Sequence, residues 1–120
     1  MSDTKEVLTA ARQLGQLIAA HPAARGLAEV EAEFEKDIDT QRLLTDFDRA
    51  AETIARKEHE GKPIEVADKR ALEQLRVSVA QSALVRRMQG AQMDYMDLMR
   101  QVNQAISPGA GAPPDGMAQG

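Results

Sequence analysis

Apolar residues recur every three or four positions through most of the chain, a spacing typical of amphipathic helices. The pattern divides the sequence into five predicted helices, over residues 4–20, 22–36, 40–60, 66–79 and 83–106. The sequence shows neither a repeat of fixed period nor a hairpin turn between alternating segments. We therefore predict an all-α protein, an antiparallel helical bundle in which the last helix is the longest.

Punctuating residues mark the ends of the predicted helices. Pro22 suits the first turn of the second helix. After an acidic break, Asp39 or Thr40 is expected to cap the third helix, and Gly61 is expected to end it in a left-handed conformation. Ser82 is a candidate cap for the fifth helix.

Residues 29–35 also fit a second interpretation, because glutamates there alternate with Val, Ala and Phe as in a strand. We prefer a helix, since Glu and Ala are poor strand formers and no partner strand is evident. In the fourth helix the residues expected to face inward share helical spacing: Ala71, Leu72, Leu75 and Val79.

The last helix carries the longest apolar stripe of the chain. Alternating steps of four and three give a near-heptad seam, made of Leu84, Met88, Ala91, Tyr95, Leu98, Val102 and Ala105. Met93, Met96 and Met99 are expected to widen this apolar face. We predict that the seam is the main protein-contact surface, through Leu84, Met88, Ala91, Tyr95, Leu98 and Val102.

Composition indicates that the core is thin. Aromatic residues make up 2% of the chain, and much of the apolar fraction is Ala. A small domain gains stability when it buries a leftover apolar stripe against a second copy of itself. We therefore predict a homodimer.

The sequence contains few residues or motifs that indicate catalysis or the binding of a metal or cofactor. It has no Cys, which excludes disulfides and thiolate ligands or nucleophiles. His21 and His59 lie at helix boundaries without organised partners, so we predict no metal, no cofactor and no enzymatic activity. The net charge of −4 does not favour nucleic acid as a direct partner.

Two further expectations concern location and domain organisation. The polar start lacks the features of a signal peptide, and no apolar run approaches the roughly 20 residues that span a bilayer. We predict a cytoplasmic protein without membrane insertion. Residues 1–107 form the predicted helical domain, and residues 108–120, rich in Gly, Ala and Pro, form a predicted disordered tail.

Four segments stand in a recognisable order: Leu14-Gly15-Gln16-Leu17-Ile18 before His21-Pro22; Asp37-Ile38-Asp39 leading to Leu43-Leu44 and Phe47; Gly61-Lys62-Pro63-Ile64; and Met88, Ala91, Gln92, Leu98, Val102 and Ile106. Together they resemble the YlbF/YmcA family of small bacterial helical regulators. The resemblance covers about residues 7–106.

The resemblance implies a cytoplasmic, non-enzymatic helical adaptor that forms dimers or higher oligomers. In some bacteria such proteins join a complex that adjusts RNA processing by the endoribonuclease RNase Y. Some of these complexes carry iron–sulfur clusters linked to Cys, which this chain cannot supply. Our leading hypothesis is an adaptor that acts through a homodimer and at least one protein partner. The alternative is a scaffold or chaperone-like module that holds apolar peptides on its Met-rich last helix.

The composition of the tail predicts the outcome of a deletion. Removing residues 108–120 is expected to leave the thermal midpoint nearly unchanged, because the tail has too little apolar surface to pack on the body. Thermal unfolding followed by circular dichroism checks this. A fall of many degrees would show that the tail contributes to the folded body.

Overall fold

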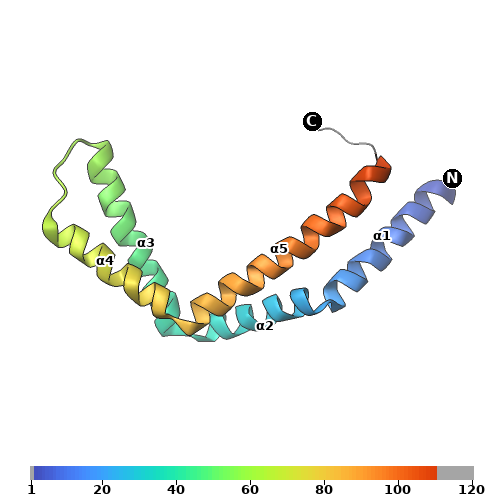
Figure 1. The fold of residues 1–120 in the computed structure, drawn as a ribbon, viewed down its shortest axis with the longest axis horizontal. Coiled ribbons are helices and arrows are strands. Elements are labelled where there is room, and N and C mark those ends of the chain that lie inside the picture. The colour runs from blue at the N-terminus through green and yellow to red at the C-terminus, as the bar shows by residue number, and fades with distance from the viewer. Residues whose placement is uncertain (1, 111–120) are drawn as a thin grey trace. The chain divides into compact units, whose positions relative to one another are not determined.

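The computed structural model describes residues 2–110, which form five α-helices and, within that range, no strand (Figure 1). The helices are α1 (Ser2–Ala20), α2 (Pro22–Lys36), α3 (Ile38–His59), α4 (Val66–Gln81) and α5 (Ala83–Ala110). The predicted all-α class and the five helices are confirmed. Residues 29–35 lie within α2, so the strand-like alternation there does not produce a strand.

Several helix boundaries differ from the predicted ones by one to four residues, among them the start of α3 and the end of α5. α3 begins at Ile38 and is capped by Asp37, not by Asp39 or Thr40, because the Asp37 Oδ1 atom accepts a hydrogen bond from the Thr40 backbone N–H at 2.9 Å. α5 continues to Ala110, since a proline such as Pro108 removes one backbone donor but keeps a helical φ. Of the predicted tail, residues 111–120 lie outside the described part of the chain.

The chain divides into two compact units, which are described separately. The central unit comprises residues 29–89, and the terminal unit joins residues up to 28 with those from 90 onward. α2 and α5 each contribute one end to each unit.

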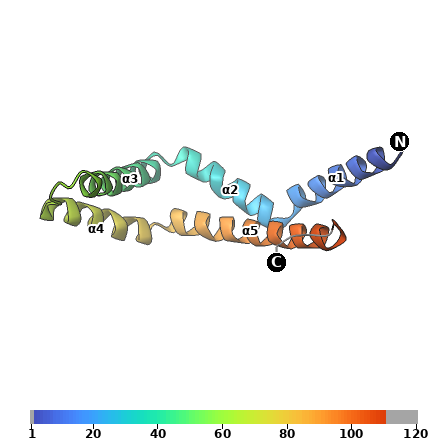
Figure 2. The same ribbon diagram turned by 90° about the horizontal axis from the view of Figure 1, so that it is seen from above.

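The α3 and α4 helices fold back on one another in the central unit, and both views show them side by side (Figures 1 and 2). The turn between them contains Gly61, whose φ of 71° is the left-handed conformation predicted from the sequence. The Gly61 N–H donates to Glu58 O at 3.2 Å, and the Lys62 N–H donates to Lys57 O at 2.8 Å. These two bonds satisfy carbonyls that the end of α3 would otherwise leave unpaired.

Asp68 ties α3 to the start of α4. Its Oδ2 atom lies 2.5 Å from Lys57 Nζ and accepts the Glu65 backbone N–H at 3.2 Å. The hydrogen bond from Lys57 is the main cause that lowers the pKa of Asp68, and the hydrogen bond from the Glu65 backbone lowers it further. One ionised carboxylate thus caps α4 and links it to the neighbouring helix.

The buried core is small and lies in the central unit. Among residues 3–107 the buried positions are Val30 and Val85, which are 2% and 4% exposed, and Thr40. On α4, the predicted inward residues Leu72, Leu75 and Val79 are half-buried, but Ala71 is exposed. A helix turns by about 100° per residue, which carries Ala71 away from the stripe of the other three.

Two glycine substitutions separate backbone strain from helix propensity. Gly61→Ala should lower the free energy of unfolding by about 1 kcal/mol, because a Cβ atom there meets no neighbour within 4 Å and only the left-handed conformation opposes it. Gly90→Ala, inside α5 and equally open, should raise it by about 0.5–1 kcal/mol. Urea denaturation measures both, and effects of the same sign would contradict this account.

Candidate interaction surface

The described residues offer neither a membrane span nor a metal centre. None of the five helices is long and apolar enough to cross a bilayer. Within residues 2–110 no group of three or more His, Asp or Glu side chains is placed to hold a metal ion. The apolar surface of the helices is therefore the feature to examine.

The predicted seam lies on α5 with each of its named residues partly exposed. Its members in the central unit are half-buried: Leu84 and Met88. Its members in the terminal unit are also half-buried, apart from the exposed last one: Ala91, Tyr95, Leu98, Val102 and Ala105. The chain thus covers the seam only in part, and its role as an interface stays a prediction.

Val85 is the α5 residue that the chain buries most deeply, and the seam pattern missed it. It follows Leu84 directly, so it points about 100° away from the seam. Its backbone N–H donates to Ser82 Oγ at 3.2 Å, which confirms Ser82 as the cap of α5. The burial depends on this joint between helices, which apolar spacing along one helix does not reveal.

The terminal unit exposes a second apolar stripe, on α1. Its residues at helical spacing are Val7, Ala11, Leu14 and Ile18, of which Val7 is 66% exposed and Leu14 and Ile18 are half-buried. Leu8 and Leu17 are also exposed, but they point to opposite sides of this stripe. Among residues 3–28 and 90–107 not one is buried. The α1 helix and the part of α5 in this unit therefore present apolar side chains that the chain itself leaves in contact with water.

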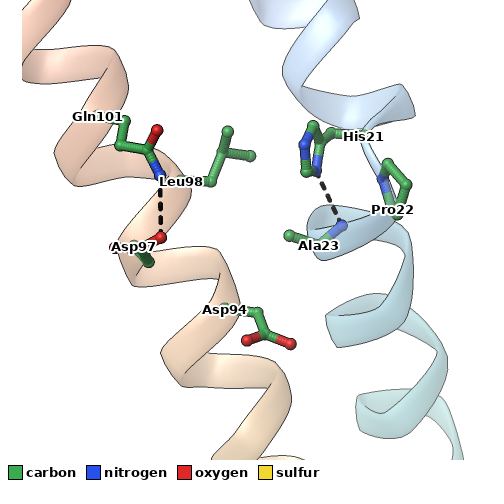
Figure 3. A pocket seen from close by; sticks show the side chains of 7 residues that line it. All are labelled: His21, Pro22, Ala23, Asp94, Asp97, Leu98 and Gln101. Atoms are coloured by element: carbon green, nitrogen blue, oxygen red, sulfur yellow. Dashed lines mark hydrogen bonds between the residues drawn. The ribbon is translucent and has the colours of Figure 1, made fainter.

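A hollow of about 410 Å³ lies within the terminal unit (Figure 3). The residues of the α1–α2 junction and of α5 that line it are His21, Pro22, Ala23, Asp94, Asp97, Leu98 and Gln101. Figure 3 shows the Leu98 side chain pointing from α5 into this hollow. Leu98 is thus a seam residue whose side chain faces an open space.

His21 has a structural task at the edge of this hollow. Its Nδ1 atom accepts the Ala23 backbone N–H at 3.0 Å and so caps the start of α2. Because that lone pair is already engaged, it is not available to act as a general base. The interpretation of His21 as a boundary residue is confirmed, and His59 likewise lies in the last turn of α3.

Asp97 supplies negative charge beside Leu98. Its carboxylate accepts hydrogen bonds from Arg100 at 2.5 Å and from Gln101 Nε2 at 2.9 Å. The bond from Arg100, followed by that from Gln101, lowers the pKa of Asp97, so the group is ionised at neutral pH. Leu98, the apolar residue that faces the hollow, therefore lies next to the ionised carboxylate of Asp97.

The methionines of α5 do not all widen the seam. Met99 is half-buried, but Met93 and Met96 are 69% and 67% exposed. Met93 follows Ala91 by two positions and Met96 follows Tyr95 by one, so their helical directions turn away from the seam toward the other side of α5. The prediction that Met93 and Met96 widen the apolar face of the seam is therefore wrong.

A bidentate ion pair in the central unit joins α2 to α5. Arg87 donates to both carboxylate oxygens of Glu33, at 2.9 and 2.6 Å. The hydrogen bond from Arg87 is the main cause that lowers the pKa of Glu33. From the sequence both residues read as ordinary surface charges, and no local signal connects positions 54 residues apart.

Comparison with known proteins gives one decisive match. A family-level sequence model, described as control of competence regulator ComK, YlbF/YmcA, matches residues 7–109. The chain belongs to the YlbF/YmcA family. Searches of curated proteins and of solved structures each gave no match.

The YlbF/YmcA match includes nearly all of the helical body. It begins in α1 and ends one residue before the last residue of α5. The resemblance noted in the sequence, over about residues 7–106, is therefore confirmed. The family's description is regulatory, which directs attention to protein contacts such as those that the seam and the α1 stripe could make.

The Glu33–Arg87 pair predicts a pH-dependent effect of one substitution. Because its folded-state pKa is lowered, Glu33 contributes stability that is present at neutral pH and is lost as pH falls through that pKa. Glu33→Gln should therefore lower the urea midpoint at pH 7 and have little effect well below the ordinary glutamate pKa of about 4.3. Glu31→Gln, also an exposed α2 residue, is the control. An equal loss at both pH values would contradict a role for the ionised pair.

Proposed function

We propose that this chain is a non-enzymatic regulatory adaptor of the bacterial cytoplasm that works by protein–protein contact as a homodimer. One observation carries the proposal. The terminal unit exposes apolar stripes on α1 and α5, and none of its residues 3–28 and 90–107 is buried.

Energetics favours a second copy as the cover for these stripes. Burying one large aliphatic side chain contributes about 1.5–3 kcal/mol, and the α1 stripe leaves Val7 exposed and Leu14 and Ile18 only half-buried. A symmetric dimer lets the stripe of each copy cover the stripe of the other, so a single surface serves twice. Contiguous apolar surface of this kind is typical of interaction sites.

The regulatory role rests on family membership. The family is described as acting in control of the competence regulator ComK. For this chain we propose a place in a complex that modulates RNA processing by an RNase Y-type endoribonuclease, as its resemblance to adaptors of that kind implies. Any iron–sulfur cluster in such a complex would need thiolate ligands from other subunits, because this chain has no Cys.

The exposure of Met93 and Met96 supports a second candidate, a scaffold or chaperone-like module. Methionine side chains adapt to varied apolar partners, and these two lie uncovered on α5. Affinity purification from the native bacterium separates the two proposals. A small set of RNA-processing proteins supports the adaptor, whereas a broad set of unfolded clients supports the chaperone-like module.

Leu98 offers the sharpest substitution test of the dimer. Leu98→Ala should cost about 2–5 kcal/mol at a site covered by a partner, and Leu98→Asp should dissociate or unfold the protein because it adds an unpaired carboxylate. Asn103→Asp, which adds the same charge at an exposed α5 position off the seam, is the matched control. Mass by light scattering and thermal unfolding are the measurements. If both Leu98 variants keep wild-type mass and stability, Leu98 is not part of the interface.

A further inference from the structure

Five helices have four connections between them. Two of these connections are single residues with no proline or glycine next to them. Asp37 alone separates α2 from α3, and Ser82 alone separates α4 from α5. In contrast, Pro22 follows the α1–α2 break, and the α3–α4 turn contains Gly61 and Pro63. Sharp kinks in helices are caused by such residues or by a side chain that inserts into the backbone hydrogen-bond ladder. The breaks at Asp37 and Ser82 carry no such covalent obstacle.

The two breaks share one pattern of backbone hydrogen bonds. In each, the break residue's N–H donates to the carbonyl three residues earlier, and its own carbonyl accepts from the N–H four residues later. All four bonds are 3.1 Å long: Asp37 N to Phe34 O, Gln41 N to Asp37 O, Ser82 N to Val79 O, and Arg86 N to Ser82 O. The chain therefore leaves and re-enters the helical ladder in the same way at both places.

Each break is also capped by its own side chain. Asp37 Oδ1 accepts the Thr40 N–H at 2.9 Å, and Ser82 Oγ accepts the Val85 N–H at 3.2 Å. Thr40 and Val85 are both among the buried residues of the central unit. The ψ angles of the two break residues, 88° and 117°, are the part of the backbone that departs from a helix.

Side chains from the far side of each break satisfy carbonyls on the near side. Gln41 Nε2 donates to Phe34 O at 2.7 Å, and an Arg86 guanidinium nitrogen donates to Ala80 O at 2.9 Å. In an unbroken helix these carbonyls would accept backbone N–H groups from four residues later. Bent and continuous backbones would thus exchange one set of hydrogen bonds for another.

The two breaks are physically connected within the central unit. The Glu33–Arg87 ion pair joins α2 just before the first break to α5 just after the second. A groove of about 650 Å³ is lined from both sides, by Asp37 and Ile38 together with Ala83 and Leu84 among others. The two breaks therefore share one ion pair and border one groove.

We propose that Asp37 and Ser82 form a paired two-state joint. Rotation of ψ at both residues to helical values fuses α2 with α3 and α4 with α5, and the caps and side-chain staples are replaced by backbone bonds. This device is independent of the adaptor role, and a failure of either leaves the other standing.

The absence of Cys makes the chain suited to a spin-label distance measurement. Glu31→Cys and Glu52→Cys place labels at exposed positions on either side of the first break, both in the central unit. In a continuous helix these positions are about 32 Å apart, at 1.5 Å per residue, and in the bent state they are closer. Labelled protein diluted into an excess of unlabelled protein reports only distances within one chain.

The proposal expects two distance populations in the otherwise unaltered full-length chain. Ile38→Pro with Ala83→Pro should leave only the shorter one, because proline is tolerated in the first turn of α3 and α5 but not inside a continuous helix. Asp37→Ala with Ser82→Ala should enrich the longer one by removing both caps. Ile38→Ala is the control for loss of the Ile38 side chain.

Two results would overturn the paired joint. One is a single distance population that is the same in the proline variant and in the unaltered chain, which would show a fixed bend. This comparison decides the question even if the cap variant does not fold. The other is a longer population that persists with both prolines present, because a continuous helix could not then be its source.

Discussion

Apolar side chains stabilise a folded protein only where water is removed from them, and this chain removes water completely from very few. Among residues 3–107 the buried apolar residues are Val30 and Val85, and both belong to the central unit. Among residues 3–28 and 90–107, Leu98 and the other apolar side chains stay at least partly wet. The scarcity of internal burial makes the uncovered stripes of α1 and α5 the part of the molecule that most needs a partner.

Where burial is scarce, local hydrogen bonds fix the geometry. Asp68 caps α4 and holds it to Lys57 of α3, and the left-handed Gly61 closes the turn between these helices. Asp37 and Ser82 set the directions in which α3 and α5 begin. These contacts bury little apolar surface, although they fix where the helices begin and end. They leave the apolar faces of the helices available for association with other proteins.

Much of this fold follows from local features of the sequence. Helical periodicity predicts all five helices, and Pro22, Gly61 and Ser82 mark boundaries because each acts within its own turn. The N-cap of α3 was placed too late, since Asp37, Asp39 and Thr40 are all good caps and only the backbone geometry selects among them. The Glu33–Arg87 pair joins segments 54 residues apart, and spacing along one helix encodes neither this pair nor the burial of Val85. The seam residues Leu84 to Val102 are only half-buried within the chain, and their role as a protein interface stays a prediction.

The mass of the full-length protein in solution tests the central claim most directly. If a second copy covers the stripes of α1 and α5, light scattering across the micromolar range should give about twice the chain mass of 13.1 kDa, falling toward it only on dilution. A mass of 13.1 kDa at every concentration would contradict the account, because the exposed apolar stripes would then be stable in water without a second copy.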